Sequence, residues 1–205
     1  MTELSLTLTV EPDYIKKDKI ERRQTLENRQ QLNQFLAAIE RRAFQIALIS
    51  TRNPDDALEL VQEAMLKLVE KYHSRPEEEW SPLFYRILSS KINDWYRKQN
   101  VRNRWLSWLP SRQLNPELNY DPIDNAKSPT KGPASELRQK EATTQLIKHL
   151  EKLSPRQQQA FLLRAWEGMS VEETAFAMKC SEGSVKTHYS RAIHHLREQL
   201  EEYRE

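Results

Sequence analysis

The sequence is poor in features that mark whole classes of protein. It has one cysteine, Cys180, so no disulfide can form within the chain, and such usage fits a reducing compartment. No apolar run approaches the ~20 residues that a membrane-spanning helix needs, and the N-terminus lacks the apolar core of a signal peptide. We therefore expect a soluble, cytoplasmic protein without membrane insertion.

Glycine and strand patterns are also scarce. The 205 residues include three glycines, and the one alternating apolar stretch is "LSLTLTV" at 4–10. Charged residues make up 30% and apolar residues 38%, which is polar for a single large globule. These figures predict an all-α fold with two small helical domains, each with a modest core.

Proline marks the boundary between the two domains. Residues 110–133 contain five of the ten prolines and one of the three glycines, a composition typical of a linker. We expect an N-terminal extension at 1–30, a helical domain at 31–104, a flexible linker at 105–135 and a second helical domain at 136–205.

Charge is unevenly distributed, although the net charge is only +2. Residues 53–63 contain four acids and no base, whereas residues 82–104 contain six bases and one acid. An acidic segment next to a basic one indicates two different partners.

Helix starts can be placed in the first half. Asn53 is a good N-cap, Pro54 suits the first turn, and the two following acids favour a helix N-terminus. Residues 73–82 are expected to form a loop before a helix at 82–99. One face of that helix is predicted to carry the apolar side chains Phe84, Leu88, Ile92 and Trp95.

Three serines predict helix starts in the second half: Ser154, Ser170 and Ser181. In the last helix, a rotation of 100° per residue puts one apolar stripe on the buried side: Val185, Tyr189, Ala192, Leu196 and Leu200. The opposite face carries Ser184, Thr187, Arg191 and His194, flanked by Lys186 and His188.

This arrangement predicts a helix-turn-helix. The helix preceding the turn presents Val171, Thr174, Ala175 and Met178 inward, and only about three residues separate it from the last helix. Such a second helix lies in the DNA major groove with its N-terminal side chains on base edges. Gly183 would let a phosphate or base approach closely. A solvated polar face is the alternative.

The basic segment is also aromatic, with eight of the seventeen aromatic residues within 72–108. Trp80, Tyr85 and Tyr96 are candidates for stacking on exposed bases, worth about 1–3 kcal/mol per base. Phosphate contacts would come from Arg86, Lys91, Arg97, Lys98, Arg102 and Arg104. The combination fits the capture of single-stranded DNA, with core packing as the alternative for any one aromatic residue.

The residues at 153–200 resemble the promoter −35-binding region of bacterial RNA polymerase sigma factors of the extracytoplasmic-function type. The matching positions are Leu153, Arg156, Gln157, Glu167, Gly168, Ser170, Glu172, Glu173, Gly183, Val185 and Lys186. The run "GSVKTH" equally resembles the DNA-binding module of LuxR-type response regulators.

The first half distinguishes the two families. "NPDDALELVQEAMLKL" at 53–68 resembles the polymerase-binding helix of the sigma family, and "PLFYRILSSKINDWYRKQ" at 82–99 resembles its −10-binding and melting helix. A LuxR-type regulator would have a receiver or sensor domain here. The resemblance covers roughly residues 31–200.

The resemblance implies partners and site residues. Core RNA polymerase would bind, through the coiled coil of its β′ subunit, to Asp55, Asp56, Glu59, Gln62, Glu63 and Leu66. The −10 promoter DNA would contact Trp80, Arg86, Ser89, Ser90, Asn93, Arg97 and Lys98. The −35 promoter DNA would contact Ser184, Lys186, Thr187, His188 and Arg191. An anti-sigma factor is a further partner implied by the family.

The chain departs from the family pattern at three places. Leu88-Ser89-Ser90 stands where the family often has Ala-Arg-Asn, so the −10 preference is open. His188 stands where arginine is common, and its charge near pH 7 is open. Lys179 replaces a usual turn glycine, at a cost of about 1 kcal/mol if the backbone is left-handed there.

Two other functions remain as alternatives. One is a LuxR-like regulator that binds DNA without being a polymerase subunit. The other is a metal-dependent nucleic-acid enzyme, because Asp55, Asp56, Glu59 and Glu63 could ligate Mg²⁺. The chain has no Gly-rich phosphate loop and no zinc spacing between its five histidines and Cys180. We therefore expect no catalytic activity, no metal and no cofactor.

Overall fold

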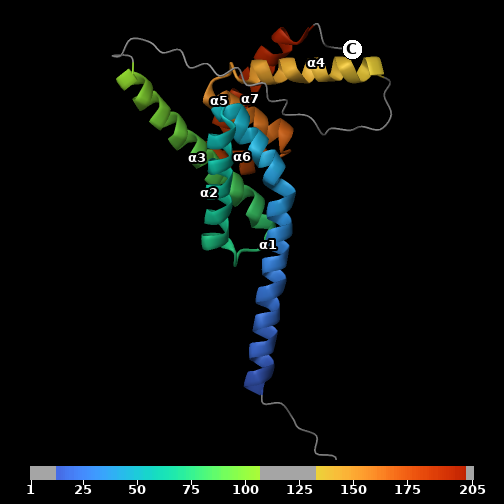
Figure 1. Ribbon diagram of the computed structural model, residues 1–205, viewed down its shortest axis with the longest axis vertical. Helices are drawn as coiled ribbons and strands as arrows, with labels where there is room; N and C mark the ends of the chain where they lie inside the picture. Colours follow the sequence, from blue (N-terminus) through green and yellow to red (C-terminus); the bar gives the residue numbers. More distant parts are fainter. Residues whose placement is uncertain (1–12, 107–132, 202–205) are drawn as a thin grey trace, which may run out of the picture.

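Three helices form the first half of the computed structural model, which describes residues 13–106 and 133–201. They are α1 (Asp13–Thr51), α2 (Pro54–Tyr72) and α3 (Glu77–Leu106). The N-terminal part of α1 extends well beyond the ends of α2 and α3 (Figure 1). The first helix therefore starts before the domain boundary expected at residue 31, which lies inside it.

The second half contains five shorter elements, and every element of the described residues is helical. They are α4 (Pro133–Leu150), α5 (Pro155–Phe161), the π-helical turn η1 (Leu162–Trp166), α6 (Val171–Met178) and α7 (Glu182–Gln199). Most of the expected linker and the stretch 4–10 lie outside the described residues.

The caps expected at Asn53, Ser170 and Ser181 are present, and Ser154 is the N-cap residue of α5. The Asn53 side chain accepts hydrogen bonds from the backbone N–H groups of Asp55 and Asp56, at 2.8 and 3.1 Å. Ser170 caps α6 and Ser181 caps α7, each by accepting from the backbone N–H three residues later. These local bonds satisfy N–H groups that a helix start leaves free, which explains why the sequence predicts them well.

The loop expected at 73–82 is only partly confirmed. The turn is short, and α3 already begins at Glu77, so Pro82 lies inside the helix. Three acids in the first turn, Glu77 to Glu79, favour a helix there through the helix dipole. Trp80 and Phe84, one helical turn apart, are both fully buried, so packing outweighs the hydrogen bond that Pro82 cannot make.

The helix-turn-helix stripe is confirmed. Val185, Ala192 and Leu196 are buried, and Tyr189 and Leu200 are half-buried against the core. On α6, Thr174, Ala175 and Met178 are buried. The two faces therefore meet as the 3.6-residue period requires.

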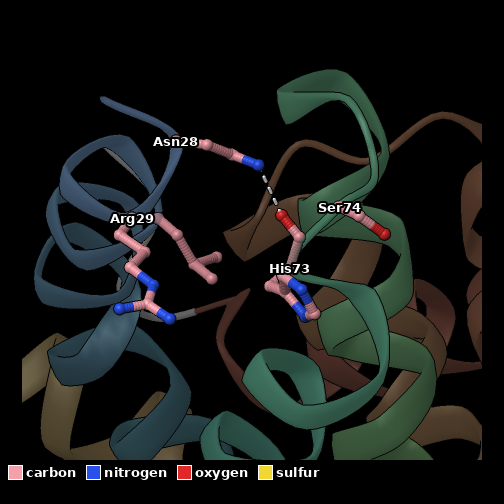
Figure 2. A pocket seen from close by; sticks show the side chains of 5 residues that line it. Asn28, Arg29, His73 and Ser74 are labelled. Atoms are coloured by element: carbon pink, nitrogen blue, oxygen red, sulfur yellow. Dashed lines mark hydrogen bonds between the residues drawn. The ribbon is translucent and has the colours of Figure 1, made fainter. Parts of the chain in front are cut away.

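A polar contact joins the far end of α2 to α1. The Asn28 side chain donates to the backbone oxygen of His73 at 2.7 Å. Beside it is a hollow, with Arg29 and His73 on opposite sides and Leu32 and Ser74 completing the lining (Figure 2). The contact ties α1 to the turn that follows α2.

Lys179 adopts a left-handed backbone, with φ 53° and ψ 50°, at the turn of the helix-turn-helix. Replacing Lys179 by glycine should stabilise the protein by about 0.5–1 kcal/mol, because only glycine adopts this conformation without Cβ strain. Denaturation by urea measures the effect.

Lys148→Gly provides the matched control, because Lys148 lies in the last turn of α4. There glycine should destabilise by about 0.5–1 kcal/mol. Equal destabilisation by both glycines would contradict the strain argument.

Candidate functional surfaces

The N-terminal turns of α7 form the first candidate surface. Lys186, Thr187 and Arg191 are exposed, and Ser184 and His188 are half-buried. The short turn after α6 puts these side chains on the outer face of the helix-turn-helix. The arrangement can place a positive helix end into a DNA groove.

The hydroxyl side chains of this surface are engaged in local hydrogen bonds, whereas the lysine is not. The Ser184 and Ser181 hydroxyl oxygens lie 2.9 Å apart, and the Thr187 hydroxyl donates to the backbone oxygen of Gly183 at 2.9 Å. Among the described residues, the Lys186 ammonium has only a long contact with the Glu182 carboxylate, at 3.9 Å. The lysine therefore retains most of its capacity to contact a phosphate.

His188 is shifted toward its neutral form. Partial burial lowers the pKa of the imidazole below its ordinary value of 6.5, and the charges of Arg156 and Arg191 lower it further. The His188 ring is therefore mostly neutral near pH 7, which answers the question that the sequence left open. A neutral imidazole can still donate or accept a hydrogen bond.

Steric crowding by the residues that the structure describes does not require a glycine at position 183. A Cβ at this position would lie 3.9 Å from Ser181 Oγ, an ordinary contact, and the backbone has no positive φ. The close approach of a ligand to Gly183 thus stays a prediction.

The second candidate surface lies along α3. Arg86, Ser90, Asn93 and Arg97 follow one another at helical spacing, so they share a stripe. Arg97 and Lys98 are exposed, and Arg97 pairs with Asp94 at 3.2 Å. The stripe provides positive charge and amide or hydroxyl donors along about three turns.

Trp80 is not available to DNA, contrary to the sequence expectation. Its side chain is fully buried and packs against Phe35 of α1, with ring centroids 5.7 Å apart. Ser89 is also buried. The expectation was wrong for Trp80 because α3 starts earlier than predicted and directs this ring into the core of the first half.

Tyr85 and Tyr96 are likewise engaged within the protein. Tyr85 is 1% exposed and donates to Glu167 Oε2 at 2.5 Å. Tyr96 donates to the backbone oxygen of Ser50 at 2.8 Å. The Tyr85 ring is therefore too buried to stack on a base, whereas Tyr96 is half-buried and its hydroxyl is tied to the backbone of α1.

The third candidate surface is the outer face of α2. Asp55, Glu59 and Gln62 are exposed, Asp56 is half-buried, and Glu63 is held by Lys91 at 2.6 Å. Leu66 is 60% exposed.

Two further apolar side chains belong to this surface and were missed from the sequence. Leu58 and Val69 are exposed, and with Gln62 and Leu66 they form a stripe at spacings of four, four and three residues. Buried Ala57, Leu60 and Val61 occupy the other side. The sequence did contain a sign of them, because α2 has more apolar residues than one buried face can hold.

Comparison with known proteins assigns both halves. Residues 34–102 match the sigma-70 region 2 family, and residues 143–196 match the sigma-70 region 4 family. The RNA polymerase sigma-E factor of Streptomyces coelicolor is 31% identical over 149 residues, which cover 72% of this chain and 73% of that protein. The chain is an extracytoplasmic-function member of the sigma-70 family.

Two other relatives agree. The ECF RNA polymerase sigma factor SigX of Bacillus subtilis is 26% identical over 170 residues, 79% of each chain. A crystal structure of the Bartonella quintana sigma factor RpoE, in complex with the anti-sigma factor NepR, is similar with a TM-score of 0.54 and 25% identity. The matched region covers 84% of this chain and 96% of the Bartonella quintana RpoE chain.

The general role of the two regions follows from the family. Sigma factors direct RNA polymerase to promoters, and regions 2 and 4 serve the −10 and −35 elements. The family consists of transcription regulators and not of known catalysts. Among the described residues, no helix is long and apolar enough to cross a membrane.

Region 2 and region 4 of this sigma factor pack against each other, mainly through α3 and α6. Glu167, which follows η1, receives the Tyr85 hydroxyl and lies 4.0 Å from Arg42 of α1. Arg86 lies over the Phe176 ring at 4.2 Å. This interface was not predicted, because pairs 82 or more residues apart leave no periodic signal in the sequence.

Two glutamines and an arginine complete the interface. The Gln159 side chain donates to the backbone oxygen of Ser89 at 3.5 Å, and Gln158 donates to Ile49 at 3.4 Å. Arg52 pairs with the Glu151 carboxylate at 3.6 Å. Elements α1 and α3 are thereby joined to α5 and to the end of α4.

The interface contains a carboxylate that is poorly compensated. Burial raises the pKa of Glu167 above its ordinary 4.5, although the Tyr85 hydrogen bond and the Arg42 charge each lower it. Burial together with the Glu167 charge raises the pKa of Tyr85 as well. The ionised carboxylate therefore destabilises the packed state at neutral pH.

Glu167→Gln should raise the melting temperature at neutral pH, since a neutral amide avoids this cost. Stability from an acid with a raised pKa is present at low pH and is lost as pH rises through that pKa. The gain in melting temperature should therefore shrink as pH falls from neutral toward the ordinary carboxyl pKa of 4.5, because the parent carboxyl then takes up its proton.

The measurement is the melting temperature of parent and variant across this range. Exposed Glu141→Gln is the control and should show no pH-dependent difference. A Glu167→Gln protein less stable than the parent at neutral pH would show that the Arg42 and Tyr85 contacts outweigh burial.

Proposed function

We propose that this sigma factor uses three separate surfaces: α2 for core RNA polymerase, α3 for the −10 element and α7 for the −35 element. The observation that carries the proposal is the coexistence of an exposed acidic and apolar face on α2 with a helix-turn-helix in the same chain. A free-standing LuxR-like regulator has no need of such an α2 surface.

The polymerase surface combines two kinds of attraction. Exposed Leu58, Leu66 and Val69 provide apolar area to bury. Asp55, Asp56, Glu59, Gln62 and Glu63 surround them with negative and polar groups. A basic coiled coil in the polymerase β′ subunit fits this pattern, and charge complementarity would speed its docking.

The −35 surface would place Ser184, Lys186, Thr187, His188 and Arg191 in the major groove. Lys186 and Arg191 supply positive charge, and the neutral His188 ring supplies a hydrogen bond. The short hydroxyl side chains, already bonded locally, allow the backbone to approach the bases.

The −10 surface would comprise Arg86, Ser89, Ser90, Asn93, Arg97 and Lys98, without Trp80. Melted DNA needs a positive track for its backbone, and the C-terminal end of the α3 stripe provides one. Base recognition would fall to the amide and hydroxyl groups in the middle of the stripe.

Two domains at 31–104 and 136–205, joined by a linker at 105–135, suit this division of labour. Each half alone would bind DNA weakly. When polymerase holds both, the second contact becomes intramolecular and gains from a high effective concentration. Promoter specificity would thus arise in the complex with core polymerase.

We also infer that the chain acts by binding and not by catalysis, and that it works in the cytoplasm with core polymerase. An anti-sigma factor is a further proposed partner, supported by the Bartonella quintana complex. Surfaces on α2 and α3 that must be free for polymerase and DNA are where such an inhibitor would act.

Run-off transcription tests the function. Core polymerase is combined with a library of promoter fragments, with and without this protein, and we expect specific transcripts only with it. Absence of transcripts together with failure to co-elute with core polymerase would favour the free-standing regulator.

Charge reversal on α2 should separate polymerase binding from DNA binding. Glu59→Lys combined with Leu66→Asp should weaken core binding at least about tenfold, because both the charge match and the buried apolar area are lost. Co-elution or fluorescence titration with core polymerase measures this. Glu141→Lys in region 4 is the control, and equal loss in both proteins would contradict the α2 assignment.

Removal of one phosphate contact should change the salt dependence of −35 binding. Lys186→Ala should weaken binding of the duplex for all sequences and reduce the slope of log K against log salt by about 1. Titration of a promoter duplex at several salt concentrations gives the slope. An unchanged slope would place Lys186 off the DNA.

A further inference from the structure

His188 stands among positive side chains on the surface proposed for −35 DNA. It directly follows the exposed Lys186 and Thr187 in the second turn of α7, and its own ring is half-buried. Arg191 lies three residues farther along the same helix, and Arg156 comes from the first turn of α5, which packs against α7. A proton on His188 would therefore add a third positive charge to a cluster built by two helices.

The polar edge of the His188 ring is uncommitted and accessible. No hydrogen bond or ion pair among the described residues involves the ring, whereas Arg156 is held by donating to the backbone oxygen of Met178 at 2.7 Å. Neither nitrogen of His188 belongs to the buried polar atoms that lack a partner. Both ring nitrogens therefore reach the surface, where a ligand can meet them.

The charges that act on His188 within the described residues are all positive. Burial lowers the pKa of the ring below 6.5, and the charges of Arg156 and Arg191 lower it further. The Cys180 thiol, in the turn after α6, also lies near Arg156, and burial raises its pKa, so it stays neutral. The helix α4 meets α7 farther along, where His149 faces His195.

A DNA phosphate would reverse this balance. Its negative charge favours the protonated ring over the neutral one and offsets the repulsion from the two arginines. A base edge, which carries no full charge, would offset that repulsion less. An imidazole that is neutral in the free chain can therefore become charged when a phosphate arrives.

We propose that −35 binding by this sigma factor is coupled to the uptake of a proton by His188, which then pairs with a phosphate of the DNA backbone. At neutral pH the ring supplies a hydrogen bond only, and at lower pH it adds an ion pair. The inference rests on the proposed −35 role of α7. The arginine that is common at this position in the family would remain charged at every pH and would show no such coupling.

The experiment measures duplex binding by the full chain as a function of pH and salt. Fluorescence anisotropy follows two labelled duplexes of equal length, one with the −35 element of a run-off promoter and one of random sequence. Between about pH 7.5 and about pH 5.5, parent affinity should rise by up to about tenfold for each unit by which DNA raises the His188 pKa. The slope of log K against log salt should steepen by up to about 1 at the lower pH.

His188→Gln should lose both effects, because an amide can form the hydrogen bond of a neutral imidazole but takes up no proton. His188→Arg should show the steeper salt slope at both pH values, since a guanidinium stays charged. Other groups that titrate in this range, Glu167 among them, are present in the parent and in both variants. A difference between these proteins is therefore due to His188.

His194→Gln is the matched control on the same helix. The His194 ring is exposed and lies 3.3 Å from the Glu198 carboxylate, so a protonated His194 already has a partner within α7. This variant should keep the pH response and the salt response of the parent.

Three results would overturn the proposal. One is a parent with equal affinity at both pH values, and another is a His188→Gln protein that keeps the pH response. A response confined to the promoter duplex would replace the phosphate contact by a contact with a base, because a phosphate contact acts on any sequence.

A failure of the proposed function would look different. If α7 does not bind DNA, the parent and the His188 variants bind neither duplex at any pH, and run-off transcripts are absent. If only the proton coupling is wrong, transcripts appear with the parent, and duplex binding does not depend on pH.

Discussion

The burial of α3 is the constraint on which the rest of the structure depends. One side of this helix, with Phe84, Leu88 and Ile92, forms the core of region 2. The adjoining side carries Tyr85 and Ser89 and packs against region 4, and next to it runs the polar stripe proposed for DNA. A helix has room for about three such faces, so covering one affects its neighbour.

This shared use explains why the interface is polar and imperfect. A fully apolar face on α3 would bury more favourably, but it would lack the polar groups that the proposed −10 role requires. Region 4 covers Tyr85 and Ser89 and holds Arg86 over the Phe176 ring. The raised pKa of Glu167 is the electrostatic counterpart of the same compromise.

Features that depend on neighbouring residues were predictable. Asn53, Ser170 and Ser181 cap helices through bonds spanning two or three residues, and the stripe through Val185 and Leu196 follows the helical period. Lys179 is left-handed as its place in the turn suggested. The start of α3 was misplaced because Pro82 indicates a break locally, while the buried Trp80 extends the helix through contacts with α1.

The sequence by itself determined the helices, the helix-turn-helix, the family and the list of candidate surfaces, since all of these follow from short-range pattern and motif. Only the tertiary structure decided which candidates are accessible. It removed Trp80, added Leu58 and Val69, and joined Tyr85 to Glu167 across 82 positions. The physical reason is that burial and pairing between distant segments depend on how whole faces meet, and a single residue's chemistry does not encode that.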